Sequence, residues 1–195
     1  MTSRIILASR SPRRKEILEK LGLIFEVDPP EIDETPRPGE NAVSYVQRIA
    51  ATKADKVALR HEQRCIVIAA DTTVALGDEI FGQPRDLEEA RRMIQKLSKK
   101  SHSVHTAVSV RYDARSANSF DTASVMMRDV TPEMLEWYLG TGESMGKAGA
   151  YAVQGQGVAL VAEVRGETET VIGLPVWLLT EQLAKIGVNL RELRA

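Results

Sequence analysis

The apolar run Cys65–Ala70 (CIVIAA) limits the possible folds of this chain more than any other segment. A short uncharged run between polar neighbours is typical of a strand that is buried inside a sheet. A second run, Arg4–Ala8 (RIILA), predicts another buried strand near the start of the chain. Helical patterns lie between these runs and after them. This alternation of strands and helices indicates an α/β or mixed α+β fold.

Residues that begin or end helices separate the predicted elements. Ser11 and Thr131 are capping residues that each precede a proline, and Gly22, Gly140 and Gly187 are stop signals. We expect helices over residues 12–21, 41–60, 87–97, 132–139 and 175–186. We expect further strands over residues 25–27, 73–76, 79–81, 104–112, 120–130, 158–164 and 169–172. Turns are expected at Gly77-Asp78 and near residues 114–119, and a proline-rich loop at residues 29–39.

The length of the chain bounds its domain count. At about 150 residues per domain, 195 residues are a little over one domain. No repeat or linker separates two folds, so we expect a single domain over residues 1–195. A hydrophobic share of 43% is enough for a real core. The single cysteine, Cys65, excludes an internal disulfide and a cysteine-rich zinc site.

The formal net charge of −1 argues against a dedicated nucleic-acid binder, which usually carries a strongly basic face. It leaves room for a small anionic ligand that a few local cations hold. No apolar stretch approaches about 18 residues, and the start of the chain lacks a signal pattern. These features predict a cytoplasmic protein with no membrane contact.

The segment Ser9–Arg14 (SRSPRR) has the donors that a polyphosphate needs. It lies between a predicted strand and a predicted helix, where backbone N–H groups carry partial positive charge. The hydroxyls of Ser9 and Ser11 and the guanidinium groups of Arg13 and Arg14 add further donors and charge. The alternative is an ordinary capped helix with solvated arginines. The segment lacks the glycine spacing of a P-loop.

Two acidic positions can hold a divalent metal ion. Asp71 directly follows the apolar run, where a carboxylate must be solvated, paired or metal-bound. Glu34 lies in the acidic loop Glu31–Glu34, and the two carboxylates together match the oxygen ligands of Mg²⁺ or Mn²⁺. Asp71 can also orient an attacking water molecule. The alternatives are an aspartate that caps a turn and a solvated acidic loop.

Lys53 and the segment Gly146–Gly157 are the remaining candidates. Lys53 has alanine neighbours at Ala50 and Ala54, which places it near the buried edge of its helix, where it can neutralise phosphate charge. Gln154 lies in the glycine-rich segment and has both a donor and an acceptor for reading a base edge. The alternatives are an exposed helix lysine and a flexible turn.

Together these segments resemble the Maf family of nucleoside triphosphate pyrophosphatases, in the expected order over nearly the whole chain. The matching segments are Leu7–Arg14, Ile32–Glu34, Lys53, Ala70–Thr72, Pro84–Asp86, Lys147–Tyr151 with Gln154-Gly155, and Gly173–Pro175. Each segment alone is a weak signal, whereas the ordered set is highly specific.

The resemblance implies an elongated mixed β-sheet flanked by helices, with two lobes around a central cleft, as in Maf and ITPase-like proteins. It implies a homodimer that hydrolyses a nucleoside triphosphate between the α and β phosphates, with Mg²⁺, Mn²⁺ or Co²⁺ as cofactor. The Ala70–Thr72 (ADT) and Lys147–Gln154 (KAGAYAVQ) segments are similar to the branch that acts on dTTP and UTP, which extends the expectation to modified pyrimidine nucleotides.

The resemblance also implies residue roles. Asp71, Glu34 and Lys53 are expected to be catalytic, and Glu34 and Asp71 to lie beside the metal. The expected substrate-binding residues are Ser9, Ser11, Arg13, Arg14, Gln83 and Gln154. Asp71 orients or deprotonates the water, and Gln154 reads the base.

One position departs from the family pattern. Gln83 stands where the family usually has a lysine that helps to neutralise the triphosphate. Loss of a charge-assisted contact removes roughly 1.5–3 kcal/mol of binding free energy. If the contact acts on the transition state, the rate falls by about ten- to hundredfold.

The residues leave one alternative function open. The protein could be a non-enzymatic nucleotide-binding regulator of septum formation.

Overall fold

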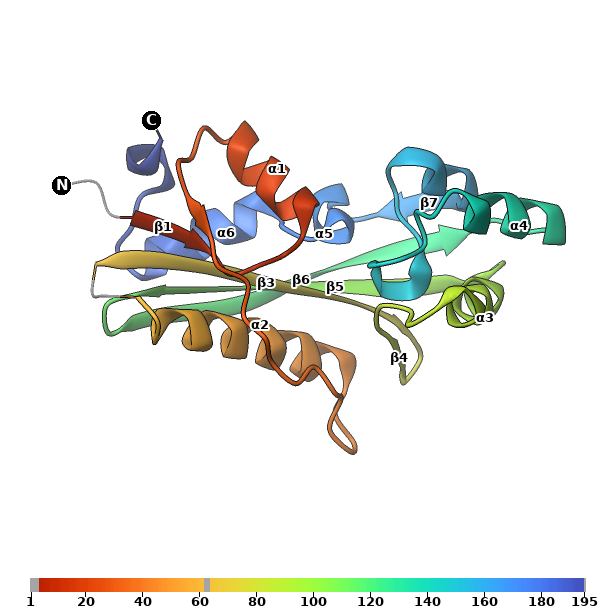
Figure 1. Cartoon of the computed structure of the whole chain (residues 1–195), viewed down its shortest axis with the longest axis horizontal. Coiled ribbons are helices and arrows are strands. Elements are labelled where there is room, and N and C mark those ends of the chain that lie inside the picture. Colours follow the sequence, from red (N-terminus) through yellow and green to blue (C-terminus); the bar gives the residue numbers. More distant parts are fainter. Residues whose placement is uncertain (1–3, 62–63, 195) are drawn as a thin grey trace. The chain divides into compact units, whose positions relative to one another are not determined.

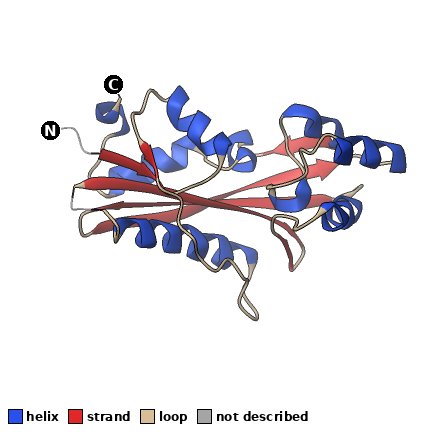
Figure 2. Cartoon of the chain, viewed as in Figure 1, coloured by secondary structure: helices blue, strands red, loops and turns tan. Residues whose placement is uncertain are grey.

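The structure is a computed structural model that describes residues 4–61 and 64–194. The chain divides into two compact units. Unit 1 consists of Met1–Asp71, Thr106–Asp121 and Gly173–Ala195, and unit 2 of Thr72–His105 and Thr122–Ile172. The chain contains both helices and strands (Figure 2). The predicted cleft between two lobes stays a prediction, as does the single domain.

The strands form one mixed seven-stranded sheet in the order β2-β1-β3-β5-β6-β7, with β4 paired to β3. The strands are β1 (Arg4–Leu7), β2 (Glu26–Val27), β3 (Cys65–Leu76), β4 (Glu79–Phe81), β5 (Ser101–Tyr112), β6 (Arg115–Met127) and β7 (Val161–Arg165). The β1 strand pairs in parallel with β2 and β3, whereas β4 and β7 pair antiparallel with β3 and β6. The predicted mixed sheet with flanking helices is therefore confirmed.

Helices cover both faces of the β1–β3 pair in unit 1. They are α1 (Pro12–Lys20), α2 (Ala42–Ala58) and α6 (Val176–Lys185), and the short 3₁₀ helix η3 (Leu190–Leu193) follows. Figure 1 shows α2 on one face and α1 and α6 on the other. Because both faces are covered, the strands at the centre read as continuous apolar runs rather than alternating ones.

The side chains of β1 and β3 alternate between two separate clusters. Ile5 and Leu7 pack with Ile66 and Ile68 in the cluster that contains α1 and α6 residues. Ile6 packs with the odd-numbered β3 residues and with the α2 residues in the other cluster, whose members are Ile6, Ala8, Ala54, Val57, Cys65, Val67 and Ala69. Successive strand residues point to opposite faces, so the parity of a β3 residue decides which helix it meets.

Unit 2 has its own apolar core. Its helices are α3 (Leu87–Leu97), α4 (Pro132–Gly140) and α5 (Thr168–Ile172), and its 3₁₀ helices are η1 (Ala148–Ala150) and η2 (Gly155–Leu160). The fully buried Ile94 and Leu97 of α3 and Tyr138 of α4 pack in one cluster with Leu160. The predicted turn at Gly77-Asp78 joins β3 to β4 and is confirmed.

Several predicted strands differ from the structure. The strand β5 begins at residue 101 instead of 104, β6 ends at residue 127 instead of 130, and the strands predicted over 65–70 and 73–76 are the single strand β3. Residues 169–172 belong to helix α5, where the buried Thr170 donates its backbone N–H to Glu167 O at 3.1 Å. The strand predicted from residue 158 begins at Val161, because η2 occupies the residues before it. The polar stretch 115–119 is part of β6, since Asp113 takes a positive φ of 52° and closes a tight turn. Tertiary contacts override local propensity in each case.

Among the described residues, no helix combines the length and the apolar character that crossing a membrane requires.

Leu18 of α1 tests how much the unit 1 core contributes to the free energy of unfolding. Its side chain is fully buried, so Leu18→Ala leaves a cavity and is expected to lower the free energy of unfolding by about 2–5 kcal/mol. Leu59 is 88% exposed, and Leu59→Ala should change that free energy by less than about 0.5 kcal/mol. Urea unfolding of both variants measures the difference, and equal effects would contradict this assignment of the core.

Candidate active site

Lys53 brings two carboxylates of unit 1 together. Its Nζ lies 2.8 Å from Glu34 Oε1 and 2.8 Å from Asp71 Oδ1. The side chains of Lys53 and Asp71 are 12% and 9% exposed, whereas that of Glu34 is 46% exposed. The structure thus joins all three residues predicted to be catalytic, with Glu34 on the solvent side of the cluster.

The position of Asp71 follows from the strand that carries it. Asp71 has the same parity as Cys65, Val67 and Ala69, which pack against α2, so its carboxylate meets Lys53 of that helix. Burial raises the pKa of Asp71, and the charge of Glu34 raises it further, while Lys53 and Arg14 oppose the shift. A buried carboxylate needs such a partner, because an unpaired charge in the interior is very unfavourable.

The start of α1 is tied together by its own polar side chains. Ser11 caps the helix, and its Oγ accepts a bond from Arg14 N at 3.5 Å. Ser9 Oγ accepts from Ser11 N at 3.2 Å and from Arg14 Nη1 at 3.1 Å. Arg14 Nε also donates to Gly173 O at 2.8 Å. Ser9, Ser11 and Arg14 therefore shape the loop that was predicted to bind phosphate.

Arg14 and Arg13 differ in their surroundings. Arg14 is buried, and this burial lowers the pKa of its guanidinium, while the negative charge of Asp71 opposes the shift. Arg13 is half-buried in the first turn of α1, where the helix dipole favours anions. Arg13 is thus better placed than Arg14 to reach a ligand, although the phosphate role of both stays a prediction.

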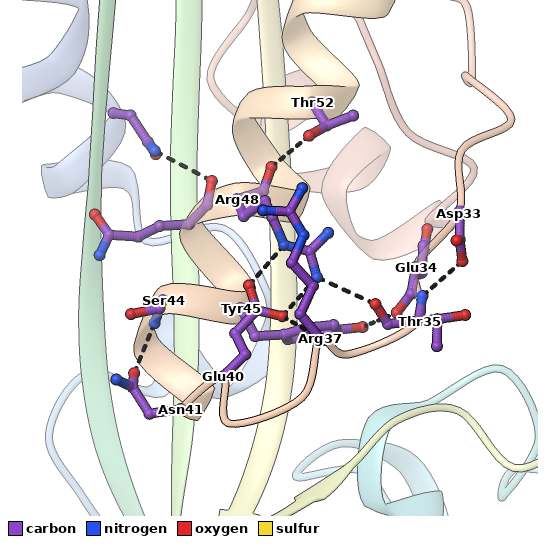
Figure 3. A network of polar contacts seen from close by, with 12 residues as sticks. Asp33, Glu34, Thr35, Arg37, Glu40, Asn41, Ser44, Tyr45, Arg48 and Thr52 are labelled. Atoms are coloured by element: carbon purple, nitrogen blue, oxygen red, sulfur yellow. Dashed lines mark hydrogen bonds and ion pairs between the residues drawn. The ribbon is translucent and has the colours of Figure 1, made fainter.

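Glu34 lies in a segment without helix or strand, residues 28–41, that side chains of α2 hold. Figure 3 shows this network, in which Glu40 is the central acceptor. Arg48 Nε and Nη2 donate to the two oxygens of Glu40 at 2.6 Å each, and Arg37 N donates at 3.0 Å. These bonds hold the pKa of Glu40 down at about 2. The segment therefore depends on a paired, largely buried carboxylate.

Gln83 and Gln154 belong to unit 2 and are exposed there. Gln154 precedes η2, and the carboxylate of Glu143 orders the next residues by accepting from Gln156 N at 3.0 Å and Gly157 N at 3.2 Å. Gly155 has a positive φ of 61°, and a Cβ there would lie 2.7 Å from Glu143 Oε1. A larger residue at position 155 would be strained by the positive φ and would displace the Glu143 carboxylate. The substrate roles of Gln83 and Gln154 stay predictions.

The carboxylates of Asp71 and Glu34 fit a metal ion of the magnesium type. No group of three or more His, Cys, Asp or Glu side chains that can hold a metal exists among residues 4–61 and 64–194. Mg²⁺ often takes only one or two protein carboxylates and completes its shell with water and phosphate oxygens. The two converging carboxylates supply that number of ligands.

The sequence analysis missed four residues that hold these segments: Glu40, Tyr45, Arg48 and Glu143. Three of them lie at or within the start of α2, where charged residues usually face solvent. Their only signal in the sequence is indirect. The proline-rich segment at residues 29–39 lacks regular structure, so side chains of the following helix are needed to hold it. Glu143 gives no local signal, because the backbone amide of Gln156 that it binds is 13 residues away.

Comparison with known proteins identifies relatives of the whole chain. A family model described as "Maf-like protein" matches residues 4–186. A dTTP/UTP pyrophosphatase of Anaeromyxobacter dehalogenans (strain 2CP-1 / ATCC BAA-258) is 45% identical over 195 residues, covering 97% of both chains. The dTTP/UTP pyrophosphatase of Myxococcus xanthus (strain DK1622) is 45% identical over 186 residues, covering 95% of this chain and 94% of its own.

A solved structure also matches, at a TM-score of 0.44 and 12% identity. It is the nucleoside-triphosphatase / dITP/XTP pyrophosphatase of Mycobacterium abscessus, and the match covers 94% of this chain and 95% of that one.

The Glu40–Arg48 pair predicts how stability depends on pH. The pKa of Glu40 falls from 4.5 to about 2 on folding, so the pair stabilises the protein fully above pH 4.5 and progressively less as pH falls to about 2. Glu40→Gln is expected to lower stability at neutral pH and to flatten its decline across that range. Urea unfolding at a series of pH values measures both effects.

The control is Glu181→Gln on α6, whose ion pair with Lys185 is about half exposed on both sides. Exposed ion pairs contribute little to the free energy of unfolding. This variant should therefore keep the wild-type dependence of stability on pH. A Glu40→Gln profile identical to wild type would contradict the role of the pair.

Proposed function

Since the chain belongs to the Maf family, we propose that it hydrolyses dTTP and UTP to the monophosphate and pyrophosphate. The observation that carries this proposal is the Lys53 cluster, in which one ammonium joins the carboxylates of Glu34 and Asp71 at 2.8 Å each. The two relatives named as dTTP/UTP pyrophosphatases support the choice of reaction and of base. Modified pyrimidine nucleotides are a natural extension of that substrate class.

The phosphates of the substrate bind at the start of α1. Backbone N–H groups there carry partial positive charge, and Ser11 fixes their direction by capping the helix. Arg13 adds a guanidinium fork, which matches the geometry of phosphate oxygens. Arg14 contributes mainly by holding Ser9 and the backbone of Gly173. Most of the catalytic effect is then positioning and electrostatic stabilisation, as phosphoryl-type chemistry requires.

Asp71 acts on the attacking water. Its carboxylate accepts one proton from the water as the oxygen bonds to the α phosphorus, and the bond from that phosphorus to the bridging oxygen breaks. Pyrophosphate leaves with the bond's electrons. The raised pKa of Asp71 makes it a better proton acceptor than an ordinary aspartate. Lys53 keeps this carboxylate oriented and offsets negative charge beside it.

Glu34 and Asp71 would hold the divalent metal ion, which when bound supplies positive charge to the phosphate oxygens. Gln154 reads the pyrimidine through its amide donor and acceptor, and Gln83 hydrogen-bonds a phosphate oxygen. The homodimer remains a prediction from the family resemblance, and the cytoplasmic location remains a prediction from the sequence.

A nucleotide panel tests the proposed activity. Purified protein is incubated with eight ribo- and deoxyribonucleoside triphosphates and inorganic pyrophosphatase, and phosphate is measured with malachite green. We expect phosphate from dTTP and UTP with Mg²⁺, Mn²⁺ or Co²⁺ and none without metal. Tight nucleotide binding with no phosphate release would overturn the proposal and favour the non-enzymatic regulator.

Asp71→Asn isolates the role of the carboxylate in the same assay. Loss of a general base lowers turnover by about 10²–10⁴-fold, while dTTP binding is largely retained. The matched control is Asp78→Asn in the exposed β3–β4 turn, which should leave the rate unchanged. Near-normal pyrophosphate release by Asp71→Asn would remove Asp71 from the mechanism.

Gln83→Lys tests whether a positive charge at this position strengthens catalysis. If a lysine here reaches the transition state, kcat/KM should rise by roughly ten- to hundredfold, the equivalent of a charge-assisted contact. Gln95→Lys adds the same charge on the exposed face of α3 and serves as the control. An equal effect of the two substitutions would show that only the net charge matters.

A further inference from the structure

Glu34 has limited support within its own segment, where Asp33 Oδ1 accepts a hydrogen bond from Thr35 N at 2.9 Å. Residues 28–41 contain no helix or strand, so the backbone there lacks the regular hydrogen bonds that fix a side chain's direction. Yet the carboxylate of Glu34 lies 2.8 Å from Lys53 Nζ. Contacts from outside the segment add to this local bond in holding the backbone on which that carboxylate depends.

Two side chains of α2 supply this support. Tyr45 Oη donates to the carbonyl oxygen of Glu34 at 2.9 Å. Arg48 Nη2 donates to the carbonyl oxygen of Thr35 at 3.2 Å. Helix α2 therefore binds the two successive carbonyl groups of Glu34 and Thr35 (Figure 3). Lys53 of the same helix binds the side chain of Glu34.

Arg48 is itself held in place. Glu40 accepts two bonds from its guanidinium at 2.6 Å each, in the paired geometry that fixes the plane of the group. The guanidinium carbon also lies 5.6 Å from the centre of the Tyr45 ring. Tyr45 is buried, and the side chains of Arg48 and Glu40 are 18% and 9% exposed. The support is thus a packed unit rather than a surface contact.

We propose that Tyr45 and Arg48, with Glu40 behind them, are positioning residues that set the Glu34 carboxylate beside Lys53 and Asp71. The proposal rests on the proposed function, in which that cluster is the reaction site. None of the three acts on the substrate. Their effect reaches the reaction only through the backbone of Glu34.

Other contacts keep the segment attached when this support is removed. Lys56 Nζ donates to Glu31 O before Glu34, and Asn41 Oδ1 accepts from Ser44 N at 2.8 Å at the start of α2. These bonds anchor both ends of the segment independently of Tyr45 and Arg48. Substitution of either residue should therefore displace Glu34 without unfolding the segment.

The kinetic test uses Tyr45→Phe and Arg48→Ala in the dTTP assay. A displacement of about 1 Å at a reacting group lowers rates by up to 10²-fold, so we expect kcat to fall roughly ten- to hundredfold with little change in KM. Arg48→Lys should not restore kcat, because one ammonium cannot form the paired contact with Glu40.

The control is Arg111→Ala. Arg111 Nε lies 2.5 Å from Asp55 Oδ1 of the same helix α2, in an ion pair away from the Glu34 segment. This variant should lose stability in urea unfolding and keep the wild-type kcat. A fall in kcat that merely followed stability across all variants would overturn the proposal.

A second readout does not require activity. An ammonium held in two ion pairs is shielded from acetic anhydride, so the acetylation rate of Lys53, measured by mass spectrometry, reports the position of Glu34. We expect this rate to rise several-fold in Tyr45→Phe and Arg48→Ala, as in Glu34→Gln, and to stay unchanged in Arg111→Ala.

The two readouts separate the two proposals. If the wild type hydrolyses no nucleotide, the proposed function fails, while Lys53 acetylation still decides whether Glu34 is positioned by α2. If Arg48→Ala does not fold, Tyr45→Phe decides alone, since it removes a single hydroxyl. Wild-type kcat and wild-type Lys53 acetylation in folded Tyr45→Phe would overturn the positioning role.

Discussion

The pairing of Asp71 with Lys53 is the interaction on which the rest of the site depends. A carboxylate at the end of six buried residues of β3 is tolerable only beside a positive charge, and α2 delivers that charge from the neighbouring face. The ammonium of Lys53 that pairs with Asp71 also forms an ion pair with Glu34. The cluster of Asp71, Lys53 and Glu34 thus depends on one buried ion pair.

In the proposed function, two helices of unit 1 contribute different parts of the triphosphate site. The start of α1 presents amide groups and Arg13, while its own serines and Arg14 make the loop rigid. Helix α2 supplies Lys53 at its middle and the support for Glu34 at its start. A single helix therefore sets both the charge of the cluster and the geometry of an irregular segment.

The sequence predicts the regular parts of the molecule well and the supporting contacts poorly. The runs at β1 and β3 and the capped helices are encoded in local pattern. By contrast, four of the five residues of α5 are β-branched, which favours a strand, and its helical form depends on packing in unit 2. Glu143 and Arg48 act through partners 8 or more residues away, so no local pattern marks them.

The alternating faces of β3 have a consequence for how the chain can change in length. Each residue advances a strand by about 3.3 Å and reverses the side on which the next side chain lies. One residue inserted between Cys65 and Asp71 would turn the carboxylate toward the α1 side, and two would restore the side but shift it by about 7 Å. Strand β3 therefore tolerates substitutions of its side chains but no insertion or deletion of residues before Asp71.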